Sequence, residues 1–225
     1  MATTRWSGAC RSRLPPGKAW RCSAPTVRAR APSSTLSAVC SRPRQAKFAS
    51  TEPIQARAGV RFAFWGAEER GLIGSRHHVA SLSEEMRRHI ALYINLDMVG
   101  SPNFVRFVQG AAATGDGLAA VVRRELLAEF REHNLSVEER AEGRFGSDGA
   151  SFSQKGIPTM GLYTGAGGPK SEIQASLFGG AAGRPYDPCY HRACDTIENI
   201  NRDVLEQNTR ALVRALNAAA IPAQR

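Results

Sequence analysis

Three short runs of mainly apolar residues mark the strands that this sequence predicts. Residues 60–65 read VRFAFW, residues 91–98 read ALYINLDM, and residues 157–163 read IPTMGLY. Runs of this length, rich in β-branched and aromatic residues, are typical of strands buried in a sheet. We therefore expect three buried strands.

The stretches between these runs predict helices. In GLIGSRHHVASL, residues 71–82, the apolar residues Leu72, Ile73 and Val79 predict a short packed helix, and Ser83 caps a further helical turn. Two longer amphipathic helices are expected over residues 118–130 and 203–219, whose apolar positions are Leu118, Val121, Val122, Leu126, Leu127 and Phe130 in the first and Val204, Leu205, Leu212, Val213 and Leu216 in the second.

Residues 164–188, rich in Gly, Ala and Pro, predict a long loop, and we find no internal repeat. Apolar strands that alternate with amphipathic helices indicate an α/β fold in which helices cover both faces of a sheet. A chain of 225 residues is long enough for one such domain with a sizeable core.

The net charge of +10 is confined to one end of the chain. Residues 1–58 contain 11 Lys and Arg against one acid (11 − 1 = +10), whereas residues 59–225 contain 19 of each sign (19 − 19 = 0). A basic tail without interleaved aromatic residues or a recognisable DNA-binding motif is weak evidence for nucleic-acid binding. We therefore expect no nucleic-acid partner for the neutral part, residues 59–225.

Residues 1–58 show neither strand nor helix periodicity and are dominated by Arg, Ala, Ser and Pro. This composition is typical of a disordered segment or of an organellar transit peptide. The chain has no apolar run of the roughly 20 residues that a membrane span requires, and no secretory signal precedes residue 59. We expect a domain boundary near Gly59 and no membrane partner.

Three carboxylates follow two of the predicted strands directly. Glu68 and Glu69 follow the first strand, and Asp97 ends the second, so two neighbouring strands would bring all three carboxylates to one place. Ligands of open α/β sheets gather at the carboxyl ends of strands, and clustered carboxylates require a cation or a raised pKa. A divalent metal site is therefore expected, although the two glutamates could simply begin a helix and Asp97 could be a turn residue.

His191 is the histidine most plausibly associated with this cluster. Cys189 and Cys194 flank it, and none of the five cysteines shows the C-x-x-C spacing of a zinc knuckle. A disulfide between the two would close a six-residue loop worth about 2 kcal/mol in the chain-entropy model. Such a loop would hold His191 rigidly. The simpler alternative is that His191 is an ordinary polar residue of a loop.

Four blocks of the sequence resemble, in family order, the secreted bacterial double-zinc aminopeptidases of the zinc exopeptidase superfamily. The blocks are FAFWGAEERGLIGS, INLDMVGSPN, GSDGASFSQKGIPTMGLYTGAG and FGGAAGRPYDPCYHRACDTIENIN, which span nearly all of residues 59–217. The resemblance implies a three-layer α/β/α sandwich with a central mixed sheet, two zinc ions, and removal of N-terminal residues from peptides.

The resemblance also implies roles for individual residues. It makes Glu68 the general base, and it assigns one zinc to Glu69 and His191 and the other to Asp97. A second set has supporting roles, with Tyr190 stabilising the oxyanion, Met98 and Arg144 binding substrate, and Cys189 and Cys194 forming a disulfide.

The family pattern has two more metal ligands upstream, a histidine and a bridging aspartate, but residues 1–58 contain neither His nor Asp. Arg144 is also displaced relative to the family arginine, and Gly149 stands where the family has histidine. One hypothesis is that the residues before about Ala46 are an out-of-frame translation of GC-rich coding sequence. We expect weak metal binding and little activity from this chain alone.

Two functions remain as hypotheses. The first is a metallo-aminopeptidase, monomeric and extracellular by resemblance, that acts on peptide or protein N-termini. The second is a catalytically inactive binding domain on the same fold. The retained residues Glu68, Glu69, Asp97 and His191 favour the first.

Overall fold

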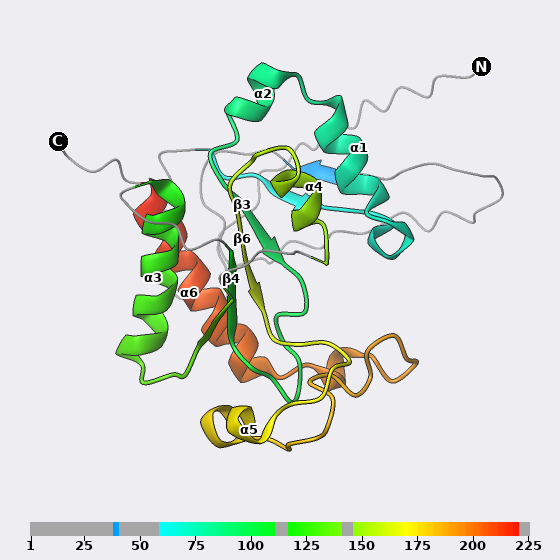
Figure 1. Ribbon diagram of the computed structural model, residues 1–225, viewed down its shortest axis with the longest axis vertical. Coiled ribbons are helices and arrows are strands. Elements are labelled where there is room, and N and C mark those ends of the chain that lie inside the picture. The colour runs from blue at the N-terminus through cyan, green and yellow to red at the C-terminus, as the bar shows by residue number, and fades with distance from the viewer. Residues whose placement is uncertain (1–37, 41–58, 111–116, 141–145, 221–225) are drawn as a thin grey trace, which may run out of the picture. The chain divides into compact units, whose positions relative to one another are not determined.

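A mixed four-stranded sheet forms the centre of the fold, in the order β3-β6-β4-β5 (Figure 1). β3 (Tyr93–Leu96) runs parallel to β6 (Thr159–Tyr163), and β6 is antiparallel to β4 (Phe107–Gly110). β5 (Glu138–Arg140) completes the sheet parallel to β4. The computed structural model describes residues 38–40, 59–110, 117–140 and 146–220, all within a unit that spans residues 35–225.

Two long helices cover one face of this sheet. α3 (Leu118–Glu132) and α6 (Arg202–Ala220) lie side by side against β4 and β6 (Figure 1). The main core lies between them and the sheet and consists of Val108, Val122, Leu126, Phe130, Met160, Leu162, Ala211, Leu212 and Ala215. The two amphipathic helices expected from the sequence are therefore confirmed. Their apolar stripes are buried against the rest of the fold, except for Leu205, which is exposed.

Shorter helices cover the other face. α1 (Ile73–Ser81) packs on α4 (Gly149–Ser153), and α4 contacts β3 and β6. Phe152 of α4 stacks on Tyr93 of β3 with ring centroids 3.8 Å apart, while Val79 and Ile157 complete this second core. α2 (Glu84–Arg88) follows α1 and begins with the expected cap, in which the Ser83 side chain accepts the Met86 N–H. Helices on both faces give the three layers that were expected.

The first expected strand differs most from expectation. β2 covers only Phe62–Phe64, and it pairs antiparallel with β1 (Ala38–Cys40) rather than with β3. Phe64 is 71 % exposed, so the expectation of a buried strand was wrong. Within the described residues only β6 is hydrogen-bonded to β3, so the expectation that β2 and β3 are sheet neighbours was also wrong.

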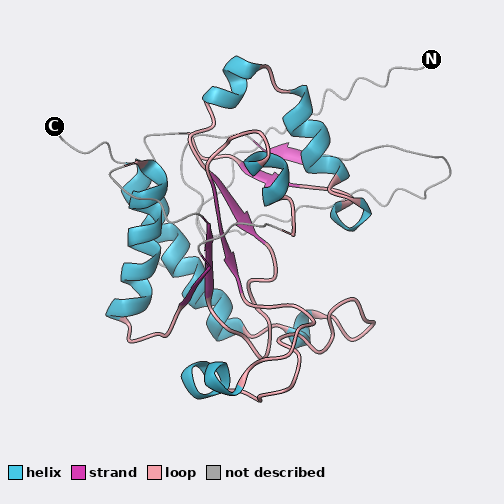
Figure 2. Cartoon of the chain, viewed as in Figure 1, coloured by secondary structure: helices cyan, strands magenta, loops and turns pink. Residues whose placement is uncertain are grey.

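The expected loop over residues 164–188 contains one helix, α5 (Glu172–Phe178). A capping box starts it, because Ser171 accepts the Gln174 N–H while the Gln174 side chain accepts the Ser171 N–H. The rest of this stretch, and most of the chain from there to α6, is loop apart from the single turn η2 (Ile197–Asn199) (Figure 2).

The expected packing of α1 needs a smaller correction at Ile73. Of the three apolar residues expected to pack this helix, Leu72 and Val79 are buried, whereas Ile73 is 44 % exposed. Among the described residues, no helix is both long and apolar enough to cross a bilayer. The expectations for residues 1–58, residues 38–40 apart, fall outside the described part of the chain.

Candidate active site

A tight turn after β2 carries Glu68 and Glu69. Both lie in the 3-10 turn η1 (Glu68–Arg70), so they do begin a helical turn as the simpler alternative proposed. Ala67, just before them, has a left-handed φ of 57°. The Gly74 N–H bonds to the Gly66 carbonyl at 3.0 Å, and a Cβ on Gly74 would lie only 2.7 Å from that oxygen. This close approach folds the chain back and projects both carboxylates from the turn.

His191 reaches one of these acids from the other end of the chain. Its Nε2 atom lies 2.6 Å from Oε1 of Glu69, and both side chains are more than half exposed. The disulfide between Cys189 and Cys194, with Cα atoms 5.3 Å apart, closes the loop that carries His191. An imidazole and a carboxylate that are distant in the sequence therefore meet at hydrogen-bonding distance.

Electrostatic effects place Asp97 in the same neighbourhood. Partial burial, followed by the charges of Glu69 and Asp97, raises the pKa of the Glu68 carboxyl. Asp97 comes directly after β3, so two separate segments direct carboxylates toward one region. A raised pKa suits a group that must accept and then return a proton near neutral pH.

Tyr190 stands beside the imidazole. Its ring stacks on that of His191 with centroids 3.8 Å apart. Burial raises the pKa of the Tyr190 hydroxyl, and the charges of Glu69, Asp97 and Glu68 raise this pKa further. The hydroxyl therefore stays protonated and able to donate a hydrogen bond at physiological pH.

Met98 is half-buried, and its backbone is strained. Its φ of 55° is left-handed, and its carbonyl accepts the Thr164 N–H at 2.7 Å. Among the other non-glycine residues described, His191, Ala67, Leu72 and Asn134 share this rare conformation, and of these Asn134 follows α3. Strained backbone at non-glycine residues concentrates at functional sites. Arg144, the other expected substrate-binding residue, lies outside the described residues.

The structure brings Asp148, which was not expected at the site, close to these acids. Asp148 is 8 % exposed, and among the described residues its Oδ1 has no hydrogen-bond partner. Burial raises the pKa of Asp148, and the nearby charge of Asp97 adds to this shift. The sequence offered one signal, an acidic residue inside the polar block GSDGAS before a buried helix.

A chain of partly buried hydrogen bonds leads to Ser147, the residue before Asp148. Trp65 Nε1 donates to the Tyr93 hydroxyl at 3.0 Å, and that hydroxyl donates to Asn95 Oδ1 at 3.3 Å. Asn95 Nδ2 in turn donates to Ser147 Oγ at 3.2 Å. Residues before Glu68, before Asp97 and before Asp148 are thereby linked in one network.

The side chains of the candidate site are of types that bind a divalent metal, but few of them are present. His, Glu and Asp are ordinary zinc ligands, and catalytic zinc usually has three protein ligands. Within the described residues, no three His, Cys, Asp or Glu side chains are grouped so that they could hold a metal ion. Glu69 and His191 offer two ligands on one side, and Asp97 offers one on the other. The unpartnered Oδ1 of Asp148 is a further free carboxylate oxygen nearby.

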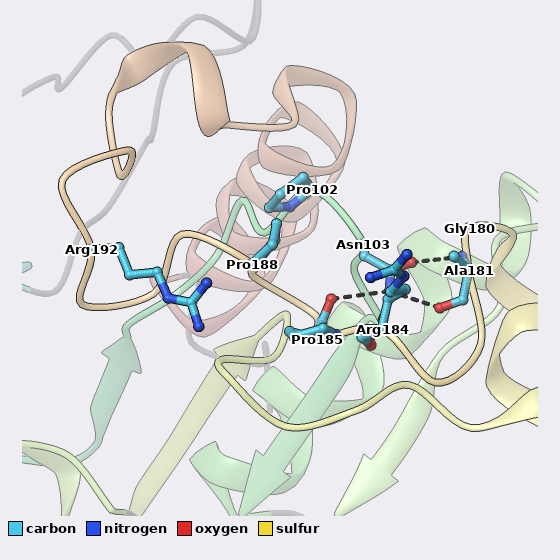
Figure 3. Close-up of a pocket in the computed structure, with 8 residues that line it drawn as sticks. All are labelled: Pro102, Asn103, Gly180, Ala181, Arg184, Pro185, Pro188 and Arg192. Atoms are coloured by element: carbon cyan, nitrogen blue, oxygen red, sulfur yellow. Dashed lines mark hydrogen bonds between the residues drawn. The ribbon is translucent and has the colours of Figure 1, made fainter.

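A separate hollow of about 720 Å³ opens beside the disulfide loop (Figure 3). The Asn103 amide fixes its wall by donating to the carbonyls of Ala181 and Pro185. Arg184 and Arg192 border the hollow, and neither forms an ion pair with another described residue. The hollow is therefore positively charged, in contrast to the acid cluster. Its lining residues are Pro102, Asn103, Gly180, Ala181, Arg184, Pro185, Pro188 and Arg192.

Comparison with solved structures shows the same fold. A zinc aminopeptidase from Bacillus subtilis matches with a TM-score of 0.58 at 24 % identity, over 76 % of this chain and 38 % of that chain. An aminopeptidase from Aneurinibacillus sp. matches with a TM-score of 0.51 at 26 % identity, over 74 % of this chain and 34 % of that one.

The relatives found by sequence share a higher identity with this chain than these solved structures do. An aminopeptidase of Pseudomonas aeruginosa is 46 % identical over 158 residues, which are 68 % of this chain and 29 % of the relative. Leupeptin-inactivating enzyme 1 of Streptomyces exfoliatus is 37 % identical over 163 residues, 72 % of this chain and 36 % of the relative. The chain thus spans about a third of the length of these relatives. The profile of Peptidase family M28 matches residues 37–216, which is most of the sequence, and the chain belongs to that family.

Proposed function

We propose that this chain carries the proton-transfer and substrate-facing part of a metallo-aminopeptidase site. The observation that carries the proposal is the contact between Glu69 and His191, with Glu68 immediately beside it. Relatives named as aminopeptidases and membership of a peptidase family support the reaction class.

In this proposal Glu69 and His191 hold one zinc ion and Asp97 holds a second. Zinc, when bound, polarises a peptide carbonyl and lowers the pKa of a bound water. The charge of Asp97 helps to raise the pKa of Glu68, which supports a shared site for the two ions.

Glu68 is proposed to move the proton. Its carboxylate accepts the proton of the attacking water and returns it to the nitrogen of the leaving amine, the usual task of a general acid/base. The raised pKa of Glu68 supports this role because the returned proton must be held between the two steps.

Two neighbours are proposed to serve the substrate. The protonated Tyr190 hydroxyl donates a hydrogen bond to the oxyanion of the tetrahedral intermediate. Met98 lines the pocket for the N-terminal side chain, and Arg144 contributes to substrate binding.

The proposed substrates are the N-termini of peptides and proteins, and the proposed compartment is extracellular. Relatives that include a leupeptin-inactivating enzyme and a probable lipoprotein aminopeptidase support this location, as does the disulfide. We further propose that the chain acts as a monomer.

The alternative is a binding domain without catalysis. It is favoured by one observation, the absence of three grouped metal-type ligands within the described residues. Such a domain would bind peptide without cleaving it.

Hydrolysis of an aminoacyl-nitroanilide by the purified chain with added zinc tests the proposal against this alternative. We expect slow, zinc-dependent release of nitroaniline that falls roughly 100-fold or more in Glu68→Gln, because loss of general acid/base catalysis has about that effect. Glu85→Gln, an exposed acid on α2, is the matched control and should leave the rate unchanged. Equal rates in the chain and in Glu68→Gln would contradict the assignment of Glu68, and zinc binding without hydrolysis would favour the binding domain.

A further inference from the structure

Two arginines border the hollow beside the disulfide loop, and both are free to bind an anion. Arg184 and Arg192 are exposed, and neither forms an ion pair with another described residue. None of the eight residues that line the hollow is acidic. Pro102 and Pro188 lie between the two arginine side chains (Figure 3). The hollow therefore combines two unpaired guanidinium groups with an apolar floor.

The wall of the hollow that carries Arg184 is fixed by hydrogen bonds. Asn103 Nδ2 donates to the carbonyls of Ala181 and Arg184 at 3.0 and 3.3 Å, and its Oδ1 accepts the Ala181 N–H at 3.0 Å. On the other side, the Lys170 N–H donates to the Arg184 carbonyl at 2.8 Å. The backbone at Arg184 is held from two directions, so it needs no ordering when a ligand binds.

A buried lysine adds positive charge behind this wall. Lys170 is 2 % exposed, and its ammonium group donates to the carbonyls of Phe104 at 2.7 Å and Gly179 at 2.5 Å. Within the described part of the chain, no carboxylate pairs with this ammonium group. The wall thus adds a third cation to the two arginines.

The acids nearest in sequence do not pair with the arginines. Asp187 is buried, and its Oδ1 accepts the Cys189 N–H at 2.9 Å and a hydrogen bond from the Asn199 side chain at 2.8 Å. Asp195 is exposed, and its side chain forms no ion pair with another described residue. Neither acid lines the hollow.

The hollow adjoins the candidate active site through the disulfide loop. Arg192 directly follows His191, so their Cα atoms are about 3.8 Å apart. The disulfide between Cys189 and Cys194 closes the loop that carries both residues. A peptide whose amino end lies at the contact between Glu69 and His191 therefore has the hollow within reach of its later residues.

We propose that the hollow binds a carboxylate group of a peptide between Arg184 and Arg192. Guanidinium groups hold carboxylates by paired, charge-assisted hydrogen bonds, and the proline, alanine and glycine residues around them suit an uncharged peptide backbone. The carboxylate is either the C-terminal group of a short peptide or the side chain of an acidic residue. The proposal rests on the function proposed above only for the choice of a peptide as the ligand.

Calorimetric titration of the full chain with three short peptides tests the hollow. The peptides are identical except that one is neutral with an amidated C-terminus, one has a free C-terminal carboxylate, and one is amidated but carries an internal glutamate. The Glu68→Gln background without added zinc keeps the peptides intact. We expect a carboxylate peptide to bind roughly tenfold more tightly than the neutral one, as expected for a hydrogen bond between charged groups. The peptide that gains affinity identifies the source of the carboxylate.

Replacing each arginine in this background assigns the gain to the hollow. Arg184→Gln and Arg192→Gln should each remove most of the roughly tenfold gain and leave the affinity for the neutral peptide unchanged. Because Arg192 is next to His191, Arg184→Gln provides a test that leaves the disulfide loop unaltered. Arg76→Gln, an exposed arginine of α1 that does not line the hollow, is the matched control and should keep the full gain.

Equal affinities for the three peptides, or an unchanged gain in either arginine variant, would overturn the proposal. Tighter binding of inorganic phosphate than of both carboxylate peptides would overturn the choice of ligand. An arginine-dependent gain in a chain that releases no nitroaniline would contradict the aminopeptidase proposal alone. Release of nitroaniline without the gain would contradict the role of the hollow alone, so failures of the two proposals are distinguishable.

Discussion

The indole N–H of Trp65 donates a hydrogen bond to the Tyr93 hydroxyl at 3.0 Å, and this contact connects the segment before Glu68 to the strand before Asp97. β2 and β3 are not sheet neighbours among the described strands, so backbone pairing does not provide that connection. Packing of Trp65 near Phe152, with ring centroids 5.8 Å apart, accompanies it. The placement of the two acid-bearing segments thus depends on side chains.

Trp65→Phe should loosen this connection. The variant keeps an aromatic ring but loses the donor, and the expected loss is about 1 kcal/mol in the free energy of unfolding, typical of one hydrogen bond. Urea denaturation measures it. Phe64→Tyr, at the neighbouring exposed position, is the control and should change stability little. Equal stability of Trp65→Phe and the unsubstituted chain would show that the hydrogen bond does not hold the two segments.

The Tyr93 hydroxyl should make the stability of the fold depend on pH in the alkaline range. Burial raises the pKa of Tyr93 from 10.0 to about 12, and the Trp65 hydrogen bond partly opposes this rise. Because the folded-state pKa is raised, the associated stability is fully present below pH 10 and is lost as the pH rises toward 12. A phenolate absorbance titration should show a tyrosine that ionises near pH 12, and this step should move later still in Trp65→Phe. Titration of every tyrosine near pH 10 would contradict this.

Gly74→Ala should disturb the turn that presents both glutamates. The new Cβ would lie 2.7 Å from the Gly66 carbonyl oxygen, so the backbone must shift, at a cost of about 1–3 kcal/mol. Thermal unfolding measures the stability, and zinc titration shows whether Glu69 has moved. Gly117→Ala, where an added Cβ meets nothing within 4 Å, is the control. An unchanged melting temperature and zinc affinity would mean that the turn tolerates the shift.

Replacing Cys189 and Cys194 together by serine should affect the site more than the fold. The disulfide closes a short loop, and its loss should cost about 2 kcal/mol in the free energy of unfolding. The freed loop carries His191, so the zinc affinity should fall by more than the stability loss alone accounts for, when it is measured well below the unfolding temperature. Unchanged zinc affinity in the folded variant would show that the loop holds His191 without the bridge.

The long periodic elements could be predicted from the sequence because their own patterns specify them. The stripe from Leu118 to Phe130 requires a helix whatever lies beside it, and it forms α3. β4 was missed although Val105, Phe107 and Val108 are fully buried, because Arg106 interrupts the run. That arginine is itself buried and hydrogen-bonded to Gln207, a partner 101 residues away, which no local pattern reveals.

The candidate site was predictable to a similar extent. Acids that follow strands predicted Glu68, Glu69 and Asp97 as candidate site residues, and the two cysteines drew attention to His191, whose imidazole lies 2.6 Å from Glu69. Asp148 was not singled out because its local sequence suits an ordinary helix start. Its burial, and the lack of a partner for its Oδ1 among the described residues, exist only in the folded chain. The separation of β2 from β3 was equally invisible, because strand pairing depends on contacts distant in sequence.

Arg214 predicts an acid-dependent loss of stability. It bridges α6 to α3 by donating hydrogen bonds to Glu125, at 3.1 Å from its Nε, and to Glu132. Hydrogen bonding from Arg214 lowers the pKa of the Glu132 carboxyl below its usual 4.5. Because this folded-state pKa is depressed, the stabilisation is present above pH 4.5 and is lost as the pH falls through the lowered value. Arg214→Gln should therefore lower the stability near neutral pH, and lower it less in strong acid, where Glu132 is protonated. Urea denaturation across this pH range measures the difference, with Arg76→Gln on the exposed side of α1 as the control. A stability difference that stays constant with pH would show that Arg214 acts through packing and not through its charge.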